Sequence, residues 1–276
     1  MTDRWPSRDF LRGTQYKTDA NLAARQSIYA YQHPSIDLAA RVLDLAAPAP
    51  AATIVDVGCG NGMYLAELAS RGRGTRALGV DLSFGMLAAA RERLTRTGPV
   101  GARDGSTTAG ASAVALASAD ATALPLRDGV ADVALAPHML YHVPEPVAAL
   151  HELRRVTRPG GRVVIVLNGA SHLRQLRVAI AAARGEANPI SERITLDEGE
   201  SLARSVFPRV TRHDFVADLR VPGPAPIADY VRSMSETSHH ADPERVVAAV
   251  VATLPRSPEG HFLINSHAGC LICEVD

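Results

Sequence analysis

The sequence shows no excess of positive charge, no long apolar run and few cysteines, and each absence excludes a class of protein. Its 29 Lys and Arg residues balance 29 Asp and Glu residues, whereas proteins that grip the nucleic-acid backbone usually carry a basic excess. No apolar run approaches the roughly 18 residues that span a bilayer, and the polar first residues predict no signal peptide. Three cysteines in 276 residues do not make a disulfide framework. We therefore expect a cytoplasmic protein that binds neither nucleic acid nor a membrane.

The sequence does hold enough aliphatic side chains for a sizeable core. Hydrophobic residues make up 46% of the chain, although only 4% are aromatic. A chain of this length suits one domain with appended parts. We divide it into an N-terminal helical arm over residues 1–50, an α/β core over residues 51–170, and residues 171–276, which carry lid helices and the last two strands.

Short β-branched runs alternate with helical patterns, which is typical of a parallel sheet covered on both faces. We predict a seven-stranded, mostly parallel sheet. A polar stretch rich in Gly, Ser, Thr and Ala at 97–113 reads as a surface loop. Insertions at 168–206 and 222–258 are expected to form a helical lid over the strand ends. The expected strands are 53–57, 75–80, 114–118, 131–136, 162–167, 210–221 and 262–275; the expected helices are 21–31, 35–47, 63–71, 84–96, 146–156, 171–185, 197–206 and 243–254.

A glycine loop gives the strongest signal of function. The segment VDVGCGNG, residues 55–62, follows a strand and opens a helix. Glycines there let the backbone approach a ligand, and the helix N-terminus offers free N–H groups. Asp81 ends the next strand, where a carboxylate can accept both hydroxyls of a ribose. The pair predicts a nucleoside-binding site.

The glycine spacing separates two cofactor classes. Dinucleotide enzymes use G-x-G-x-x-G with the pyrophosphate at the helix N-terminus, whereas this loop reads G-x-G-x-G. Asp56 just before it would repel a pyrophosphate but suits a cationic ammonium or sulfonium group. The loop therefore favours S-adenosylmethionine over NAD.

Four segments in this order and spacing resemble the class I S-adenosylmethionine-dependent methyltransferases, which have a Rossmann-like fold. They are VDVGCGNG, GVDLSFGML, SADATALPLRDGVADVAL and LRRVTRPGGRVVIV, within residues 50–170. The nearest branch looks like the ubiquinone/menaquinone-type and related small-molecule methyltransferases. In that family the glycine loop holds the methionine part, the acid after the second strand holds the ribose, and an acid after the third faces the adenine amine.

The resemblance implies S-adenosyl-L-methionine as cofactor and S-adenosyl-L-homocysteine as product. It places Tyr16 and Arg25 in a helical arm over the cofactor, while a turn cap stays open as the alternative role of Asp120. The residues it assigns to the cofactor are Tyr16, Arg25, Asp56, Gly58, Cys59, Gly60, Asn61, Gly62, Asp81, Leu82, Met86, Asp120 and Ala121.

The methyl acceptor is expected at the ends of the fourth and fifth strands. His138, Tyr141 and His142 follow the fourth strand and are the catalytic candidates, with His142 as general base or substrate ligand. Asn168 and His172 follow the fifth strand and are candidates for binding the substrate. Each also has a structural interpretation as a satisfied polar group. His138 and His142 lack a third ligand at metal spacing, so we expect no metal.

Two further patterns carry weaker hypotheses. Basic residues of the arm could bind an acidic substrate or form a solvated face; they are Arg4, Arg8, Arg12, Lys17 and Arg25. Cys270 and Cys273 spell C-x-x-C, but residues three apart on a strand point to opposite faces and cannot pair.

Together these observations predict an enzyme, a methyltransferase acting on a small molecule of natural-product or isoprenoid-like type. Two alternatives stay open: an NAD(P)-dependent oxidoreductase, and a scaffold that binds the cofactor without catalysis. A homo-oligomer is also compatible with the sequence.

Overall fold

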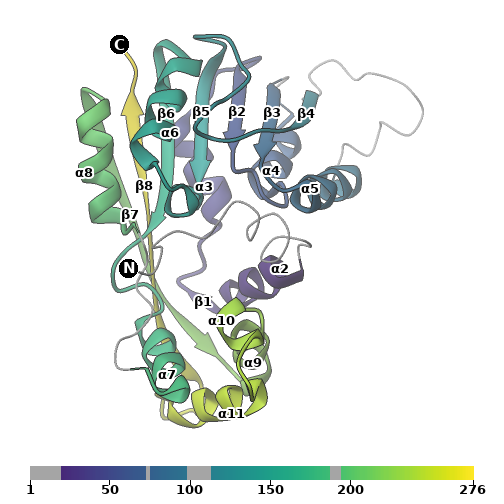
Figure 1. The fold of residues 1–276 in the computed structure, drawn as a ribbon, viewed down its shortest axis with the longest axis vertical. Helices are drawn as coiled ribbons and strands as arrows, with labels where there is room; N and C mark the ends of the chain where they lie inside the picture. Colours follow the sequence, from purple (N-terminus) through teal and green to yellow (C-terminus); the bar gives the residue numbers. More distant parts are fainter. Residues whose placement is uncertain (1–19, 73–74, 98–112, 187–193) are drawn as a thin grey trace.

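The computed structural model describes residues 20–72, 75–97, 113–186 and 194–276. Within them one sheet holds eight strands in the order β1-β7-β8-β6-β5-β2-β3-β4 (Figure 1). Neighbours from β6 to β4 are parallel, whereas β8 is antiparallel to β6 and β7, and β1 is antiparallel to β7. The strands are β1 (Gln32–His33), β2 (Thr53–Val57), β3 (Arg76–Asp81), β4 (Ala113–Ser118), β5 (Ala131–Pro137), β6 (Thr157–Asn168), β7 (Arg209–Val221) and β8 (Phe262–Glu274). The predicted Rossmann-like, mostly parallel sheet is confirmed.

The strand count differs from the expected seven because of β1. Its two residues pair with Leu219 and Asp218 at the edge of β7. Two residues are too few to show the alternation by which a strand is recognised in a sequence, so the extra strand was not predictable from pattern.

Helices account for most of the remaining described chain. None of those in the described ranges is long and apolar enough to cross a bilayer. They are α2 (Ala20–Ser27), α3 (Leu38–Ala46), α4 (Met63–Ser70), α5 (Phe84–Thr97), α6 (Pro146–Val156), α7 (Arg174–Arg184), α8 (Leu196–Val206), α9 (Pro224–Arg232), α10 (Ser235–Ser238) and α11 (Pro243–Thr253), with the 3₁₀ turns η2 (Ile28–Tyr31) and η4 (Leu140–His142).

Each face of the sheet packs on its own helices. Val163 and Ile165 of β6 point to one face, where they join residues of α6 and α8 in a core. Val164 and Val166 point to the other, where α3 and α4 supply the partners. Both faces of β6 are covered over Val163–Leu167, which is the reason that this part of the strand is apolar without interruption.

A third core supports the lid. Strands β7 and β8 run past the parallel strands, and their far ends meet α7, α9 and α11 (Figure 1). Leu219 and Phe262 of these ends are buried with Ile180 of α7, Ile227 of α9 and Val250 of α11. The lid is thus built on the sheet's own antiparallel strands, and the arm joins it through Ile28, which is buried in the same core.

Two helices expected in the arm or the lid lie on the sheet. Helix α8 buries Leu196, Ala203 and Val206 against the α6 face, and a capping box of Thr195 and Glu198 fixes its start. Helix α3 covers the opposite face. The described arm is therefore only α2 and η2, and the lid is α7 with α9 to α11.

Candidate active site

A cavity of about 850 Å³ opens at the carboxyl ends of the parallel strands, where α/β sheets bind their ligands. It brings together nearly all the predicted site residues within the described ranges. Those that line it are Arg25, Gly58, Cys59, Gly60, Asn61, Asp81, Leu82, Met86, Asp120, Ala121, His138, Tyr141, His142, Asn168 and His172. Asp56 and Gly62 lie outside its lining, and Tyr16 lies outside the described residues.

The glycine loop is held in place by the next strand. The N–H groups of Gly58 and Cys59 both donate to the Val80 carbonyl, at 2.7 and 3.0 Å. At Gly58 a Cβ would lie 2.5 Å from the Met139 Cβ, so packing requires that glycine. Gly60 differs, because a Cβ there would meet only Leu22, at 3.6 Å. Gly60 is therefore the point at which backbone faces the open cavity.

Asp81 ties this loop to the next one. Its Oδ2 accepts from the Gly60 N–H at 2.9 Å, and its Oδ1 accepts from the Ser83 N–H at 2.8 Å. Burial raises the pKa of the Asp81 carboxyl, while these N–H donors oppose the rise. Each carboxylate oxygen can accept a further hydrogen bond, which leaves capacity for a diol at the cavity wall. Ser83 in turn caps α5 through the Met86 N–H.

Asp56 lies behind the loop and is fully buried. Neither of its carboxyl oxygens has a hydrogen-bond partner in the part of the chain that the structure describes. Burial, and then the charge of Asp81, raises the pKa of Asp56 to about 8. Asp56 does not line the cavity, and its raised pKa leaves it mostly protonated, and so uncharged, at pH 7.

Asp120 caps a turn and also lines the cavity, so its adenine-binding role stays a prediction. Its Oδ1 accepts from the N–H and the hydroxyl of Thr122, at 2.9 and 2.8 Å, which caps the turn. It also lines the cavity beside Ala121, where a carboxylate can accept from an exocyclic amine.

The arm contacts the glycine loop through Gln26, a residue that the sequence analysis did not single out. Asn61 is buried and donates from Nδ2 to Oε1 of Gln26 in α2, at 3.1 Å. Leu22, Arg25, Gln26 and Tyr29 all line the cavity. Counted from Leu22, the other three lie three, four and seven residues along the chain, so all four share one helix face. A helix face is usually recognised from its apolar residues, so the polar Gln26 gave no such signal.

Three predicted side chains that follow β5 line the cavity, those of His138, Tyr141 and His142. His138 follows β5 with a φ of +54°, a left-handed backbone uncommon outside glycine. Burial lowers the pKa of His138 to about 4, so it is neutral at pH 7. Tyr141 and His142 follow in η4 with their rings in edge contact, 4.6 Å between centroids.

His172 supports a tyrosine that was not predicted. Its Nδ1 accepts from the His267 N–H at 3.1 Å, and its Nε2 lies 2.8 Å from the Tyr29 hydroxyl. Burial first, and then nearby groups including His138 and Arg177, lowers the pKa of His172 to about 3. A neutral ring that accepts at Nδ1 carries its proton on Nε2, so His172 donates to Tyr29.

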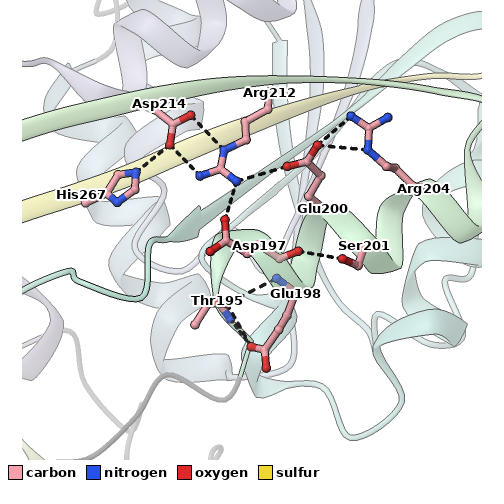
Figure 2. Close-up of polar contacts among 9 residues, drawn as sticks. All are labelled: Thr195, Asp197, Glu198, Glu200, Ser201, Arg204, Arg212, Asp214 and His267. Carbon is pink, nitrogen blue, oxygen red and sulfur yellow. Dashed lines mark hydrogen bonds and ion pairs between the residues drawn. The ribbon is translucent and has the colours of Figure 1, made fainter.

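The support for His172 extends to an ion-pair network on the sheet (Figure 2). Nε2 of His267 lies 2.7 Å from Oδ1 of Asp214, which is paired with Arg212 at 2.8 Å. Arg212 also pairs with Asp197 and Glu200 of α8, at 2.5 and 3.2 Å. The network ties α8 to β7 and β8, which fixes the strand that holds His172.

The three cysteines are buried. Cys270 and Cys273 are buried in the cores on opposite faces of the sheet, as predicted. Burial raises the pKa of the Cys59 thiol far above its ordinary value, which disfavours a thiolate. Within the described ranges no cluster of His, Cys, Asp or Glu could hold a metal ion.

A Rossmann-like sheet with an aspartate-bound glycine loop defines a nucleoside-binding α/β protein, and comparison with known proteins narrows that class. Residues 55–165 match the family described as a methyltransferase domain. A demethylmenaquinone methyltransferase of Mycolicibacterium vanbaalenii is 37% identical over 116 residues, 42% of each chain. The malonyl-[acyl-carrier protein] O-methyltransferase of Serratia marcescens is 27% identical over 198 residues, 72% of this chain and 68% of that one.

A solved structure agrees in fold. Phosphoethanolamine N-methyltransferase 2 of Haemonchus contortus, in complex with S-adenosylhomocysteine, has a TM-score of 0.59 at 20% identity, over 98% of this chain and 60% of that one. The chain spans less than half the length of the demethylmenaquinone methyltransferase that it matches. Residues 55–165 match a methyltransferase domain, and these similarities support a class I S-adenosylmethionine-dependent methyltransferase. The predicted resemblance is confirmed, and the match across the glycine loop favours it over the oxidoreductase alternative.

Proposed function

We propose that this protein transfers the methyl group of S-adenosyl-L-methionine to a small molecule. The observation that carries the proposal is the continuity of the cavity. One cavity is lined by Gly60, Asp81 and Asp120 on one side and by Tyr29 and His142 on the other. A cofactor and a second molecule could therefore meet there away from bulk water.

The residues present fit this cofactor. Gly60 leaves open backbone where the methionine part would lie. Asp81 keeps lone pairs for the ribose hydroxyls, and Asp120 offers an acceptor for the adenine amine. The carboxyl of Asp56, which has no hydrogen-bond partner among the described residues, lies behind the loop. A cationic ligand would favour its ionised form, and ionised Asp56 would in turn favour a cation over a pyrophosphate.

When bound, the cofactor supplies an electrophilic methyl group on a sulfonium. The chain's own residues position the acceptor for in-line attack and exclude water. Tyr29, oriented by His172, offers a phenol oxygen to a polar group of the acceptor. His142 takes the acceptor's proton where one must leave, and neutral His138 gives a hydrogen bond.

An apolar acceptor suits the lid. The lid side of the cavity is lined by Leu173, Ile180, Phe215, Tyr230 and Met234. Such a wall favours a natural-product, isoprenoid-like or acyl body. Two relatives are named for demethylmenaquinone and for a malonyl group on an acyl carrier protein, and both are candidate acceptor types.

Thermal unfolding with added ligand tests the cofactor. S-adenosylhomocysteine should raise the melting temperature, and NADH should not. A ligand at about a hundred times its Kd adds about 2.7 kcal/mol of stability. Stabilisation by NADH alone would refute the proposal.

Methyl transfer from labelled S-adenosylmethionine to a panel of quinol, phenol and acyl-carrier acceptors tests catalysis. Binding without transfer to any acceptor would favour the scaffold alternative.

A further inference from the structure

Charged side chains line the cavity unevenly. The arm and the α/β core supply both signs, Arg25 and Arg93 as well as Asp81 and Asp120. Two other lining acids are already engaged, since Asp37 caps α3 and Glu67 pairs with Arg71 at 2.9 Å. Within the described residues, the lid lines the cavity with a cation, Arg177 of α7, and no carboxylate. The acceptor end is therefore electropositive.

The guanidinium of Arg177 has a hydrogen-bond donor that no described residue accepts. One guanidinium nitrogen, Nη2, donates to the Ala170 carbonyl at 2.5 Å. Its Nε is buried and has no hydrogen-bond partner within the described residues, and no described carboxylate pairs with the side chain. Arg184, at the other end of the same helix, also has one buried nitrogen without a described partner, but it pairs with Glu186 at 2.6 Å and does not line the cavity. Burying a guanidinium N–H without an acceptor costs free energy that a ligand oxygen would recover.

Two surrounding features sharpen the kind of ligand. Arg177 lies in the first turn of α7, where the helix dipole disfavours a cation and favours an anion. On the same helix, Leu173 and Ile180 line the cavity one turn before and one turn after it. A guanidinium between apolar walls suits an oxyanion on an apolar body.

We infer that the methyl acceptor carries an oxyanion, a carboxylate or a phosphate, and that Arg177 binds it. This inference rests on the proposed methyltransferase function and names its substrate class. Arg177 is a specificity-determining residue here, because it holds the acceptor at a distance from the methyl group. Its position places the anion at the lid and the reactive atom toward His142.

Calorimetry on protein saturated with S-adenosylhomocysteine tests the inference. The probes are hexanoate, hexyl phosphate and the neutral hexanamide. In the wild type at least one anion should bind about ten- to hundredfold tighter than hexanamide, the range for a charge-assisted pair. The better anion identifies the acceptor as carboxylate or phosphate. Added salt should weaken only the anions.

Variants assign the preference to Arg177. Arg177→Gln should bring anion and amide within about threefold, Arg177→Lys should keep part of the preference, and the exposed Arg174→Gln on the same helix should keep all of it. Three results overturn the inference: no anion preference in the wild type, binding of neither anion, or an undiminished preference in Arg177→Gln. Wild-type protein that fails to bind S-adenosylhomocysteine would instead refute the proposed function. Should Arg177→Gln not fold, Arg177→Lys and the salt dependence decide.

Discussion

Replacement of the buried Asp56 by asparagine should stabilise the ligand-free protein and weaken its hold on the cofactor. The folded-state pKa of Asp56 is about 8, against an ordinary value of 3.8. Between these values the unfolded chain loses the proton and the folded protein keeps it. Stability that is fully present below about pH 4 is therefore lost as the pH rises toward 8.

The magnitude follows from the size of that window. Each pH unit within it costs about 1.4 kcal/mol of unfolding free energy. From pH 4 to pH 7 the loss at this one group is about 4 kcal/mol. An asparagine side chain cannot titrate, so the stability difference between the Asp56→Asn variant and the wild type should grow by about 1.4 kcal/mol per unit from pH 5 to 7 and level off above 8. Other titrating groups cancel in this difference.

Urea unfolding followed by circular dichroism at pH 5, 6, 7 and 8 measures the effect. Asp218 is exposed on β7, and Asp218→Asn should change stability by less than about 0.5 kcal/mol at each pH. A pH-independent difference for Asp56→Asn would refute the reasoning. Above pH 8, where Asp56 of the wild type is ionised, calorimetry with S-adenosylhomocysteine should also show weaker binding by the variant, since it lacks that negative charge behind the loop.

Three further substitutions test the site from its other sides. Asp81→Ala should weaken S-adenosylhomocysteine binding at least about tenfold, since charge-assisted hydrogen bonds contribute roughly 1.5–3 kcal/mol each; calorimetry with unchanged affinity would remove Asp81 from the site. Gly60→Val should abolish binding in a folded protein, because its side chain fills the cavity, whereas Gly72→Val, at another positive-φ glycine with open space around it, should bind normally. His142→Ala should lower kcat by about 10²–10⁴ and remove a pH–rate limb if His142 is the base. A rise in KM alone would mean positioning, and unchanged kinetics would make it structural.

The parallel core was predictable from the sequence because its central strands consist mainly of apolar residues. Burial on both faces favours such residues in β2, β5 and the second half of β6, with Asp56 and Asp132 as the acidic exceptions in β2 and β5. The glycine loop and Asp81 were equally visible, since close backbone approach and the predicted ribose contact restrict the residue types allowed.

Features set by tertiary packing were not visible. Helix α8 has an amphipathic pattern that suits a lid and a sheet face equally, and only its contacts with α6 decide between them. In the sequence, Gln26 and Tyr29 look like ordinary residues of a helix surface. Only the folded structure shows that Gln26 contacts Asn61 and that Tyr29 contacts His172. Nothing in the sequence distinguishes Arg177 from the other arginines; only its position in the cavity lining does. In each case the partner lies more than 30 residues away or is a missing neighbour, and neither leaves a local signal.

The arm connects the glycine loop to the lid. Ile28 of the arm is buried with lid residues, and Gln26, two residues earlier, bonds to the glycine loop. We therefore expect a cofactor bound at the loop to stabilise the arm and, through Ile28, the lid that carries Arg177. A cationic cofactor would also offset the charge of Asp81 and Asp120. We predict that the cofactor binds before an anionic acceptor, because an anion entering first would meet these two acids without that compensation.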